Sequence, residues 1–295
     1  MLYDAIVIGG SYAGMAAALQ LARARRKVLV VDGGQRRNRF AVHSHGFLTQ
    51  DGTAAAAMAA VAKDQLLAYD TVRWLDGHVT TAERTENGFR IPLPGAESQE
   101  ARRLVLASGV VDHLPELPGL ADRWGQRVFH CPYCHGYELN QGKIGVLATS
   151  PLSMHHALLL PDWGATTLFL NGTFTPDTEQ LEQLTARGVT LEYGLIERID
   201  GELDLVMKDG RVVSLDGLFV MSRVDIGPIA DQLGCDVDLT PLGRTIKTDL
   251  MKATTVPGVY ACGDAARPGG SVAMAVGDGT LAGSAAHRSL IFDSF

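Results

Sequence analysis

The chain has 295 residues, enough for two domains of ordinary size or one large barrel. Hydrophobic residues make up 46% of it and charged residues 20%, so the composition excludes an intrinsically disordered chain and provides material for buried cores. The formal net charge of −7 argues against nucleic acid as the main partner, because phosphate binding requires a basic surface.

Cysteine content and hydropathy limit the cellular compartments in which the protein is expected. Four cysteines are too few for a disulfide scaffold. No apolar stretch approaches the roughly 20 residues that span a bilayer. The first residues, MLYDAIVIGG, carry an acid and lack the basic region of a signal peptide. We therefore expect a cytoplasmic protein without a membrane segment.

The N-terminal elements follow the order of a parallel α/β unit. A β-branched apolar run at 5–8 predicts a strand, residues 13–25 a helix, and residues 28–31 a second strand. This order implies parallel strands joined by a right-handed crossover. A further helix is expected at 54–67 and a further strand at 102–107.

A second α/β pattern follows a linker that contains Pro115 and Pro118. Its expected elements are strands at 144–147, 167–170 and 217–221, with a helix around 154–160. After Pro228, a last segment contains a strand at 259–261 and a helix at 273–290. The two α/β patterns look like a distant internal duplication.

The first glycine turn has the pattern of a dinucleotide site. Such folds use G-x-G-x-x-G after the first strand, and residues 9–14 read GGSYAG, with Ser11 in place of the middle glycine. A pyrophosphate at the helix start would meet free N–H groups and a favourable dipole. Asp32 ends the next strand, about 20 residues further on, where a carboxylate binds a ribose hydroxyl. The turn alone would also fit an ordinary strand–helix connection, but the combination indicates a dinucleotide.

Residues 130–136 read HCPYCHG and place Cys131 and Cys134 in C-x-x-C spacing. In a reducing compartment such a pair is usually metal-binding or redox-active, and an inert structural pair is a third reading. Zinc needs four ligands, and the chain has no second C-x-x-C. We favour redox chemistry, in which a thiolate attacks and His135 can take and return the thiol proton.

In this order the motifs resemble the low-molecular-weight thioredoxin reductase family of flavoproteins over nearly the whole chain. The segment 255–264, TVPGVYACGD, is similar to the second flavin motif of that family, and residues 106–109, LASG, resemble the strand end that closes its flavin domain. The resemblance implies an α/β fold of two Rossmann-like, three-layer domains. The FAD-binding domain would be discontinuous, at 1–112 and 226–295, with an inserted NAD(P)-type domain at 113–225 that carries the C-x-x-C.

The resemblance implies FAD as the cofactor, with Asp264 on its ribityl chain and His45 in a loop near the flavin. Cys262, in a flavin-domain strand, is expected to be buried and inert. The candidate FAD-binding residues are Gly9, Ser11, Tyr12, Ala13, Gly14, Asp32, Gly33, Asn38, His45, Ser108, Gly109, Gly263, Asp264, Ser271, Val272 and Ala273.

The inserted domain departs from the reductases. Their G-x-G-x-x-A turn for NADPH corresponds here to residues 148–153, ATSPLS, which contain no glycine. Side chains would obstruct a pyrophosphate, and Pro151 lacks an N–H. The basic residues that bind the 2′-phosphate are also missing at 170–173, LNGT, so NADPH is not expected to bind in the usual way. His155 and His156 replace acidic residues and are expected on a solvated helix face.

His135 stands where reductases have an acid after the second cysteine. With the degenerate nicotinamide site, this resembles the branch of FAD-dependent dithiol oxidases of the gliotoxin and holomycin type. By that pattern Cys131 exchanges with the substrate, Cys134 faces the flavin and His135 is the base. A substrate dithiol, either a small molecule or a thioredoxin-like protein, would be oxidised, and O₂ would accept the electrons.

Three alternatives stay open. The first is a thioredoxin reductase-like disulfide reductase that uses NAD(P)H or another donor such as ferredoxin. The second is a flavin-binding redox sensor that does not turn over, and the third is a zinc-binding structural protein. The resemblance also implies a homodimer, and we expect no bound metal.

Overall fold

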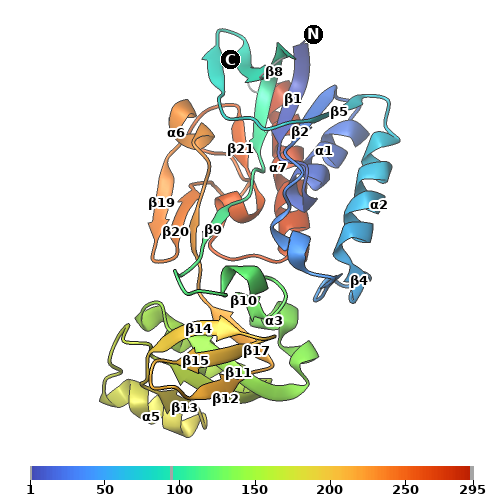
Figure 1. Ribbon diagram of the computed structural model, residues 1–295. Helices are drawn as coiled ribbons and strands as arrows, with labels where there is room; N and C mark the ends of the chain where they lie inside the picture. Colours follow the sequence, from blue (N-terminus) through green and yellow to red (C-terminus); the bar gives the residue numbers. More distant parts are fainter. Residues whose placement is uncertain (1, 94–95, 293–295) are drawn as a thin grey trace. The chain divides into compact units, whose positions relative to one another are not determined.

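The computed structural model describes residues 2–93 and 96–292. The chain divides into two compact units, one formed up to Asp112 and again from Val224 onward, the other by His113–Arg223 (Figure 1). The sequence places its domain boundaries after residues 112 and 225. The nucleotide that each unit binds stays a prediction.

The first unit is built on a seven-stranded sheet with β1 at its centre. β1 lies parallel between β2 and β8, β5 extends the sheet beyond β2, and β21 pairs parallel with β8. β7 and β6 add an antiparallel extension. The strands are β1 (Leu2–Ile8), β2 (Val28–Asp32), β5 (Val72–Asp76), β6 (Glu83–Thr85), β7 (Gly88–Leu93), β8 (Ala96–Leu106) and β21 (Val259–Ala261).

Helices α1 (Tyr12–Arg23) and α7 (Val272–Phe292) approach each other closely because small residues face each other. A Cβ on Gly279 would lie 2.0 Å from the carbonyl oxygen of Ala13. The remaining elements of this unit are α2 (Ala55–Leu67), α6 (Ile229–Leu233), η1 (Arg37–Phe40), η6 (Gly263–Ala266), the pair β3 (His43–Ser44) and β4 (Thr53–Ala54), and a sheet of β19 (Val237–Thr240), β20 (Gly243–Ile246), β18 (Arg223–Asp225) and β9 (Val111–His113).

The second unit has a five-stranded parallel sheet with β11 at its centre and a three-stranded antiparallel sheet. The parallel strands are β10 (Val128–Phe129), β17 (Gly217–Val220), β11 (Gln141–Leu147), β12 (Gly164–Phe169) and β13 (Thr190–Glu192), and the antiparallel ones β14 (Ile196–Asp200), β15 (Asp204–Met207) and β16 (Val212–Ser214). The helices are η2 (Ala121–Arg123), α3 (Pro132–His135), η3 (Tyr137–Leu139), η4 (Pro151–Ser153), α4 (Met154–Leu159), η5 (Leu160–Asp162) and α5 (Thr178–Ala186).

The predicted α/β class is confirmed by these parallel sheets. In such sheets ligands bind at the carboxyl ends of the strands. The turn at 9–14 follows β1, and the turn at 148–153 follows β11, so the two turns occupy equivalent places in their units. Among the described residues, no helix combines the length and apolar character needed to cross a membrane.

Candidate redox and nucleotide-binding site

The turn after β1 requires glycine at two positions. Gly9 has a φ of 103°, and a Cβ there would lie 2.2 Å from the carbonyl oxygen of Ala107. A Cβ on Gly14 would lie 1.8 Å from the carbonyl oxygen of Gly9. Side chains at these positions would therefore force β1, β8 and α1 apart.

The start of α1 fits a bound pyrophosphate. Ser11 is the N-cap, and its side chain makes no capping hydrogen bond to the first turn. The Gly10 N–H donates to Asp32 Oδ1 over 3.0 Å, which fixes the Asp32 carboxylate at the end of β2. A helix start without a side-chain cap, next to a fixed carboxylate, suits a dinucleotide with its pyrophosphate at the helix and its ribose at the acid.

Several predicted FAD residues contact one another around this turn. The Tyr12 hydroxyl donates to the Ala55 carbonyl oxygen over 3.0 Å, and Asn38 Nδ2 lies 3.4 Å from the Tyr12 oxygen. A Cβ on Gly33 would lie 2.4 Å from His78 Cε1, so the His78 ring covers the Gly33 backbone. No sequence motif pointed to His78.

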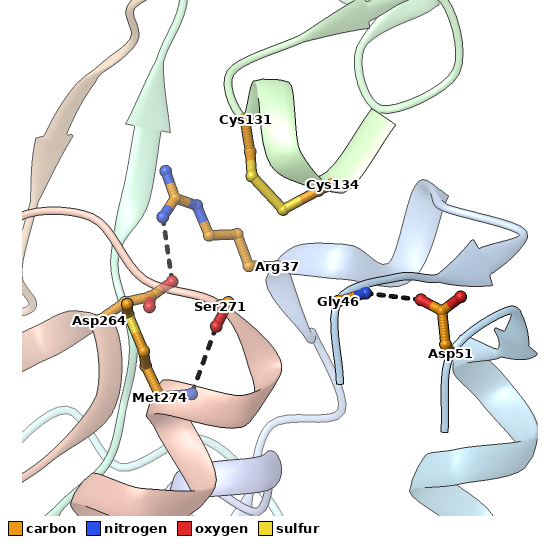
Figure 2. The surroundings of a disulfide bond; sticks show 8 residues. All are labelled: Arg37, Gly46, Asp51, Cys131, Cys134, Asp264, Ser271 and Met274. Atoms are coloured by element: carbon orange, nitrogen blue, oxygen red, sulfur yellow. Dashed lines mark hydrogen bonds and ion pairs between the residues drawn. A yellow bond between two sulfur atoms is a disulfide. The ribbon is translucent and has the colours of Figure 1, made fainter. Parts of the chain in front are cut away.

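The loop that contains His45 is held by an acid. His45 Nδ1 lies 3.6 Å from Asp51 Oδ1, and the Gly46 N–H donates to the same oxygen over 2.8 Å (Figure 2). Asp51 was also not predicted, although its position five residues after Gly46 suits a local loop contact.

Arg37 forms a cluster of charges with Asp112 and Asp264 that the sequence did not predict. Its Nε donates to Asp112 Oδ2 over 2.8 Å, and its Nη1 lies 3.0 Å from Asp264 Oδ2 (Figure 2). Burial lowers the pKa of Arg37, but hydrogen bonds and charge from Asp112 and Asp264 outweigh it, so the pKa is raised. The predicted ribityl-binding Asp264 is thus held by a guanidinium. The arginine-rich sequence QRRNRF after β2 was the available signal.

The other predicted FAD residues follow the carboxyl ends of neighbouring strands. Ser108 and Gly109 come after β8, and Gly263 and Asp264 come after β21, which pairs with β8. A Cβ on Gly263 would lie 2.8 Å from Ala13 Cβ. The sheet therefore brings these segments and the turn after β1 to one edge. Ser271 Oγ accepts from the Met274 N–H over 3.3 Å at the start of α7, where Val272 and Ala273 also lie.

The redox pair lies in the second unit. Cys131 and Cys134 form a disulfide, with their Cα atoms 5.3 Å apart (Figure 2). Cys131 is the N-cap of α3, Pro132 occupies the first helical position, and the Cys134 N–H donates to the Cys131 carbonyl oxygen over 3.3 Å. Both cysteines are half-buried, so a small thiolate can approach the pair.

His135 is oriented by a stacked ring. The imidazole lies parallel to the Phe129 ring, with centroids 4.3 Å apart and planes 19° apart. Phe129 belongs to β10 and is buried. The half-buried imidazole of His135 is thus held against a rigid strand immediately after the second cysteine.

Comparison with known proteins decides the family. The profile of the pyridine nucleotide-disulphide oxidoreductases matches residues 3–279. The chain belongs to this family. Thioredoxin reductase tcpT of Claviceps purpurea is 31% identical to it, over 99% of this chain and 95% of its own length.

Similar solved structures support the same family. An oxidoreductase from Agrobacterium tumefaciens is 55% identical over the full length of both chains, with a TM-score of 0.97. HlmI is 35% identical over 98% of this chain and 92% of its own, with a TM-score of 0.90. The predicted resemblance to thioredoxin reductase-like flavoproteins is confirmed, and the chain is an FAD-dependent disulfide oxidoreductase.

The turn after β11 occupies the place in its sheet that the glycine turn occupies after β1, and its backbone N–H groups pair with its own side chains. The Thr149 N–H donates to Ser153 Oγ over 3.0 Å, and the Leu152 N–H donates to Ser150 Oγ over 3.3 Å. Thr173, which follows β12, donates its hydroxyl to the Ala148 carbonyl oxygen over 3.0 Å. Backbone N–H groups of this turn are therefore already paired with serine oxygens.

One expectation for this region was wrong. His155 is exposed, but His156 is buried, with 4% of its surface accessible, rather than on a solvated face. Burial, with a smaller contribution from His155, lowers the pKa of His156 to about 4. The short helix α4 turns this residue toward the sheet, where its ring lies edge-on to Phe219.

Cys262 is buried as expected. None of its surface is accessible, and burial raises the pKa of its thiol to about 12. A thiol that does not ionise near neutral pH is a poor nucleophile.

Proposed function

We propose that this enzyme oxidises dithiols to disulfides, with Cys131 and Cys134 as the redox pair, FAD as the cofactor and molecular oxygen as the electron acceptor. The observation that carries the proposal is the closed turn at 148–153. Its Thr149 and Leu152 N–H groups are paired with Ser153 and Ser150, so two of the donors that a dinucleotide pyrophosphate would need are already engaged. A dithiol is then the electron source.

The chain's own residues support each step of exchange. A substrate thiolate attacks Cys131, a mixed disulfide forms, and Cys134 leaves as a thiolate. The second substrate thiol then attacks the substrate sulfur that is bonded to Cys131. This step forms the substrate disulfide and releases the Cys131 thiolate. The substrate loses two electrons and two protons, and His135 takes the proton from the attacking thiol. The stacking on Phe129 orients the imidazole for this transfer.

The first unit would hold the cofactor. Gly9, Ser11 and Gly14 would receive the pyrophosphate, Asp32 the adenosine ribose, and Asp264, fixed by Arg37, the ribityl chain. When bound, FAD would accept two electrons from the reduced pair and pass them to oxygen, which yields hydrogen peroxide. We also propose that the first unit is the FAD-binding domain and the second the NAD(P)-type domain. The protein would work in the cytoplasm as a homodimer.

A disulfide reductase is the second candidate. The observation that favours it is the 31% identity to a protein named thioredoxin reductase. In this case NAD(P)H bound elsewhere, or another donor such as ferredoxin, would reduce the pair, and a protein disulfide would be the substrate.

The deciding experiment mixes the purified, FAD-loaded enzyme anaerobically with NADPH, NADH or dithiothreitol and follows the flavin absorbance. We expect only the dithiol to bleach the flavin, and air to restore the colour with one hydrogen peroxide formed per dithiol oxidised. Fast bleaching by NADPH would overturn the oxidase proposal in favour of a reductase. Slow bleaching by the dithiol without repeated peroxide formation would indicate a redox sensor.

Cysteine variants serve as the matched control. Cys131→Ser and Cys134→Ser should each lose dithiol-driven bleaching by on the order of a thousandfold or more, because either change removes the exchangeable disulfide. Cys262→Ser should bleach at the wild-type rate. Undiminished bleaching in Cys131→Ser would contradict the role of the pair.

A further inference from the structure

Asp264 ends the segment 255–264, and within the described part of the chain only one of its carboxylate oxygens has a partner. Oδ2 accepts from Arg37 Nη1 over 3.0 Å (Figure 2). No hydrogen bond or ion pair of the described residues involves Oδ1. The side chain is 23% accessible, and Oδ1 is not one of the polar atoms sealed in the interior. Because both oxygens of a carboxylate accept hydrogen bonds, Oδ1 is available to a donor from outside the chain.

Arg37 prevents this carboxylate from turning. The same guanidinium donates from Nε to Asp112 Oδ2 over 2.8 Å and from Nη2 to Asp112 Oδ1 over 2.5 Å. This two-point contact with one acid fixes the plane of the guanidinium, and the third nitrogen, Nη1, meets Asp264. Asp264 is therefore held through Oδ2 by a group that is itself fixed.

The space beside Oδ1 is kept open by a glycine. A Cβ on Gly270 would lie 2.7 Å from Asp264 Oδ1, too close for both atoms to stay in place. The backbone does not require glycine there, since the φ of Gly270 lies outside the left-handed region. An unconstrained carboxylate would rotate away from a methyl group at little cost, but Arg37 holds this one by its other oxygen. The absent side chain at Gly270 thus leaves access to Oδ1.

The group that binds Oδ1 must donate a hydrogen. The pyrophosphate of FAD is an anion and does not fit beside a carboxylate, whereas a hydroxyl that donates to an ionised acid forms a charge-assisted hydrogen bond. FAD carries hydroxyls on its adenosine ribose and on its ribityl chain, and the ribose is assigned to Asp32 at the other end of the turn. The ribityl chain is therefore the part of FAD that suits this oxygen.

We propose that Arg37 is a positioning residue and Gly270 a specificity-determining residue for the ribityl chain of FAD. Arg37 holds Asp264 by Oδ2, and Gly270 leaves the approach of a hydroxyl to Oδ1 clear. The inference deepens the proposed function and rests on its assignment of Asp264 to the ribityl chain. It depends neither on the redox pair nor on the electron acceptor.

The test is a binding cycle with two cofactors. The full-length protein is freed of flavin and titrated with FAD, or with an FAD analogue whose ribityl chain is replaced by a five-carbon chain without hydroxyls. The dissociation constants are read from the change in flavin fluorescence. A residue that acts through a ribityl hydroxyl affects the binding of FAD alone, whereas a general loosening of the fold affects both ligands.

The variants separate the parts of the cluster. Arg37→Met removes the guanidinium, and Arg37→Lys keeps the charge without the planar fork that reaches two acids. Gly270→Ala adds a methyl group beside Oδ1. One control is Arg39→Met, which removes an exposed arginine of the same short helix η1. The other is Gly227→Ala, whose Cβ meets nothing within 4 Å.

We expect Arg37→Met and Gly270→Ala each to weaken FAD binding by about tenfold or more, and Arg37→Lys by nearly as much. For the hydroxyl-free analogue these variants should stay within about twofold of the wild type, because Asp264 has no hydroxyl to bind. Arg39→Met and Gly227→Ala should match the wild type with both cofactors. Should Arg37→Met not fold, Arg37→Lys and Gly270→Ala carry the test.

Two results would overturn the inference. One is wild-type affinity for FAD in the Arg37 and Gly270 variants. The other is an equal loss with FAD and with the analogue, which would mean that these residues only support the fold.

Asp264→Ala distinguishes this inference from the assignment on which it rests. If Asp264→Ala binds FAD as tightly as the wild type, the ribityl assignment in the proposed function falls, and this inference falls with it. If Asp264→Ala binds FAD weakly while the Arg37 and Gly270 variants bind it normally, only the present inference falls.

Discussion

The two strand–helix turns at 9–14 and 148–153 occupy the same place in their sheets and differ in what their side chains do. In the first turn the N-cap Ser11 makes no capping hydrogen bond, whereas in the second the N-cap Ser150 accepts from the Leu152 N–H. Gly10 donates to an acid on the next strand, whereas Thr149 donates to Ser153 of its own turn. The first helix start has no side-chain cap, whereas the second is capped by a serine of its own turn.

The helices that follow show the same contrast. α1 is a continuous helix of 12 residues, and Gly14 in its first turn lets it pack on the strand backbone. α4 has 6 residues and lies between two 3₁₀ segments, η4 and η5. Ser153 stands at the position of Gly14. The same strand–helix unit can therefore begin its helix with or without a side-chain cap, and the residues at the N-cap and at the position of Gly14 make the difference.

The largest expected effect is on the first turn. Gly14→Ala should yield a protein without FAD colour and with a lower melting temperature, because its Cβ would lie 1.8 Å from the Gly9 carbonyl oxygen. Overpacking in a core commonly costs about 1–3 kcal/mol, and we expect the loss here to exceed that of every other variant below because the obstructing atom belongs to the backbone and the turn is the expected cofactor site. Gly277→Ala is the matched control, since a Cβ there meets nothing within 4 Å. Full FAD content in Gly14→Ala would mean that the turn is less constrained than its geometry indicates.

The next effect concerns the helix that covers the first turn. Asp278 on α7 is buried beside Gly279, and its Oδ1 lies 2.9 Å from Lys252 Nζ. Asp278→Asn would leave the half-buried Lys252 ammonium, whose side chain is 12% accessible, without this carboxylate, and we expect the free energy of unfolding measured in urea to fall by about 3–5 kcal/mol. The control Asp162→Asn breaks the exposed pair with Arg187 and should change little. Similar unfolding midpoints for both variants would contradict this assignment.

In the second unit the expected effect depends on pH. The pKa of His156 is lowered to about 4, below that of an unfolded histidine, so the unfolded state binds more protons as pH falls. The buried neutral ring is fully tolerated above pH 6.5, and stability is lost between about pH 6.5 and 4, by up to about 3 kcal/mol. The free energy of unfolding, measured in urea, should therefore fall more over this pH window for the wild type than for His156→Gln. Parallel pH profiles would show that His156 titrates normally in the folded state.

The smallest effect is expected on the closed turn. Ser153→Gly leaves the Thr149 N–H without its acceptor and should cost about 1–3 kcal/mol. NADPH should still not bleach the flavin, because Ser150 continues to cap Leu152 and Thr173 still bonds Ala148. Stopped-flow mixing with NADPH checks this, and rapid bleaching would show that Ser153 alone keeps the turn closed.

The strongly patterned elements were predictable. The β-branched runs of β1, β2 and β11, the glycine turn and the C-x-x-C are local signals, because strand propensity, left-handed glycine and cysteine spacing are written in neighbouring residues. The antiparallel strands β14–β16 and the polar helix α5 were not predicted, since short, half-exposed elements show weak periodicity.

By itself the sequence determined the α/β class, the family resemblance and the absence of glycine from the second turn. Only the tertiary structure decided that Arg37 holds Asp112 and Asp264, which are distant in the chain, and that serine oxygens close the second turn. It also decided that His156 is buried with its ring against Phe219 of β17, while His155 beside it is exposed. The physical reason is that partner choice and burial depend on which strands and helices pack together, and a residue's chemical type does not specify its neighbours.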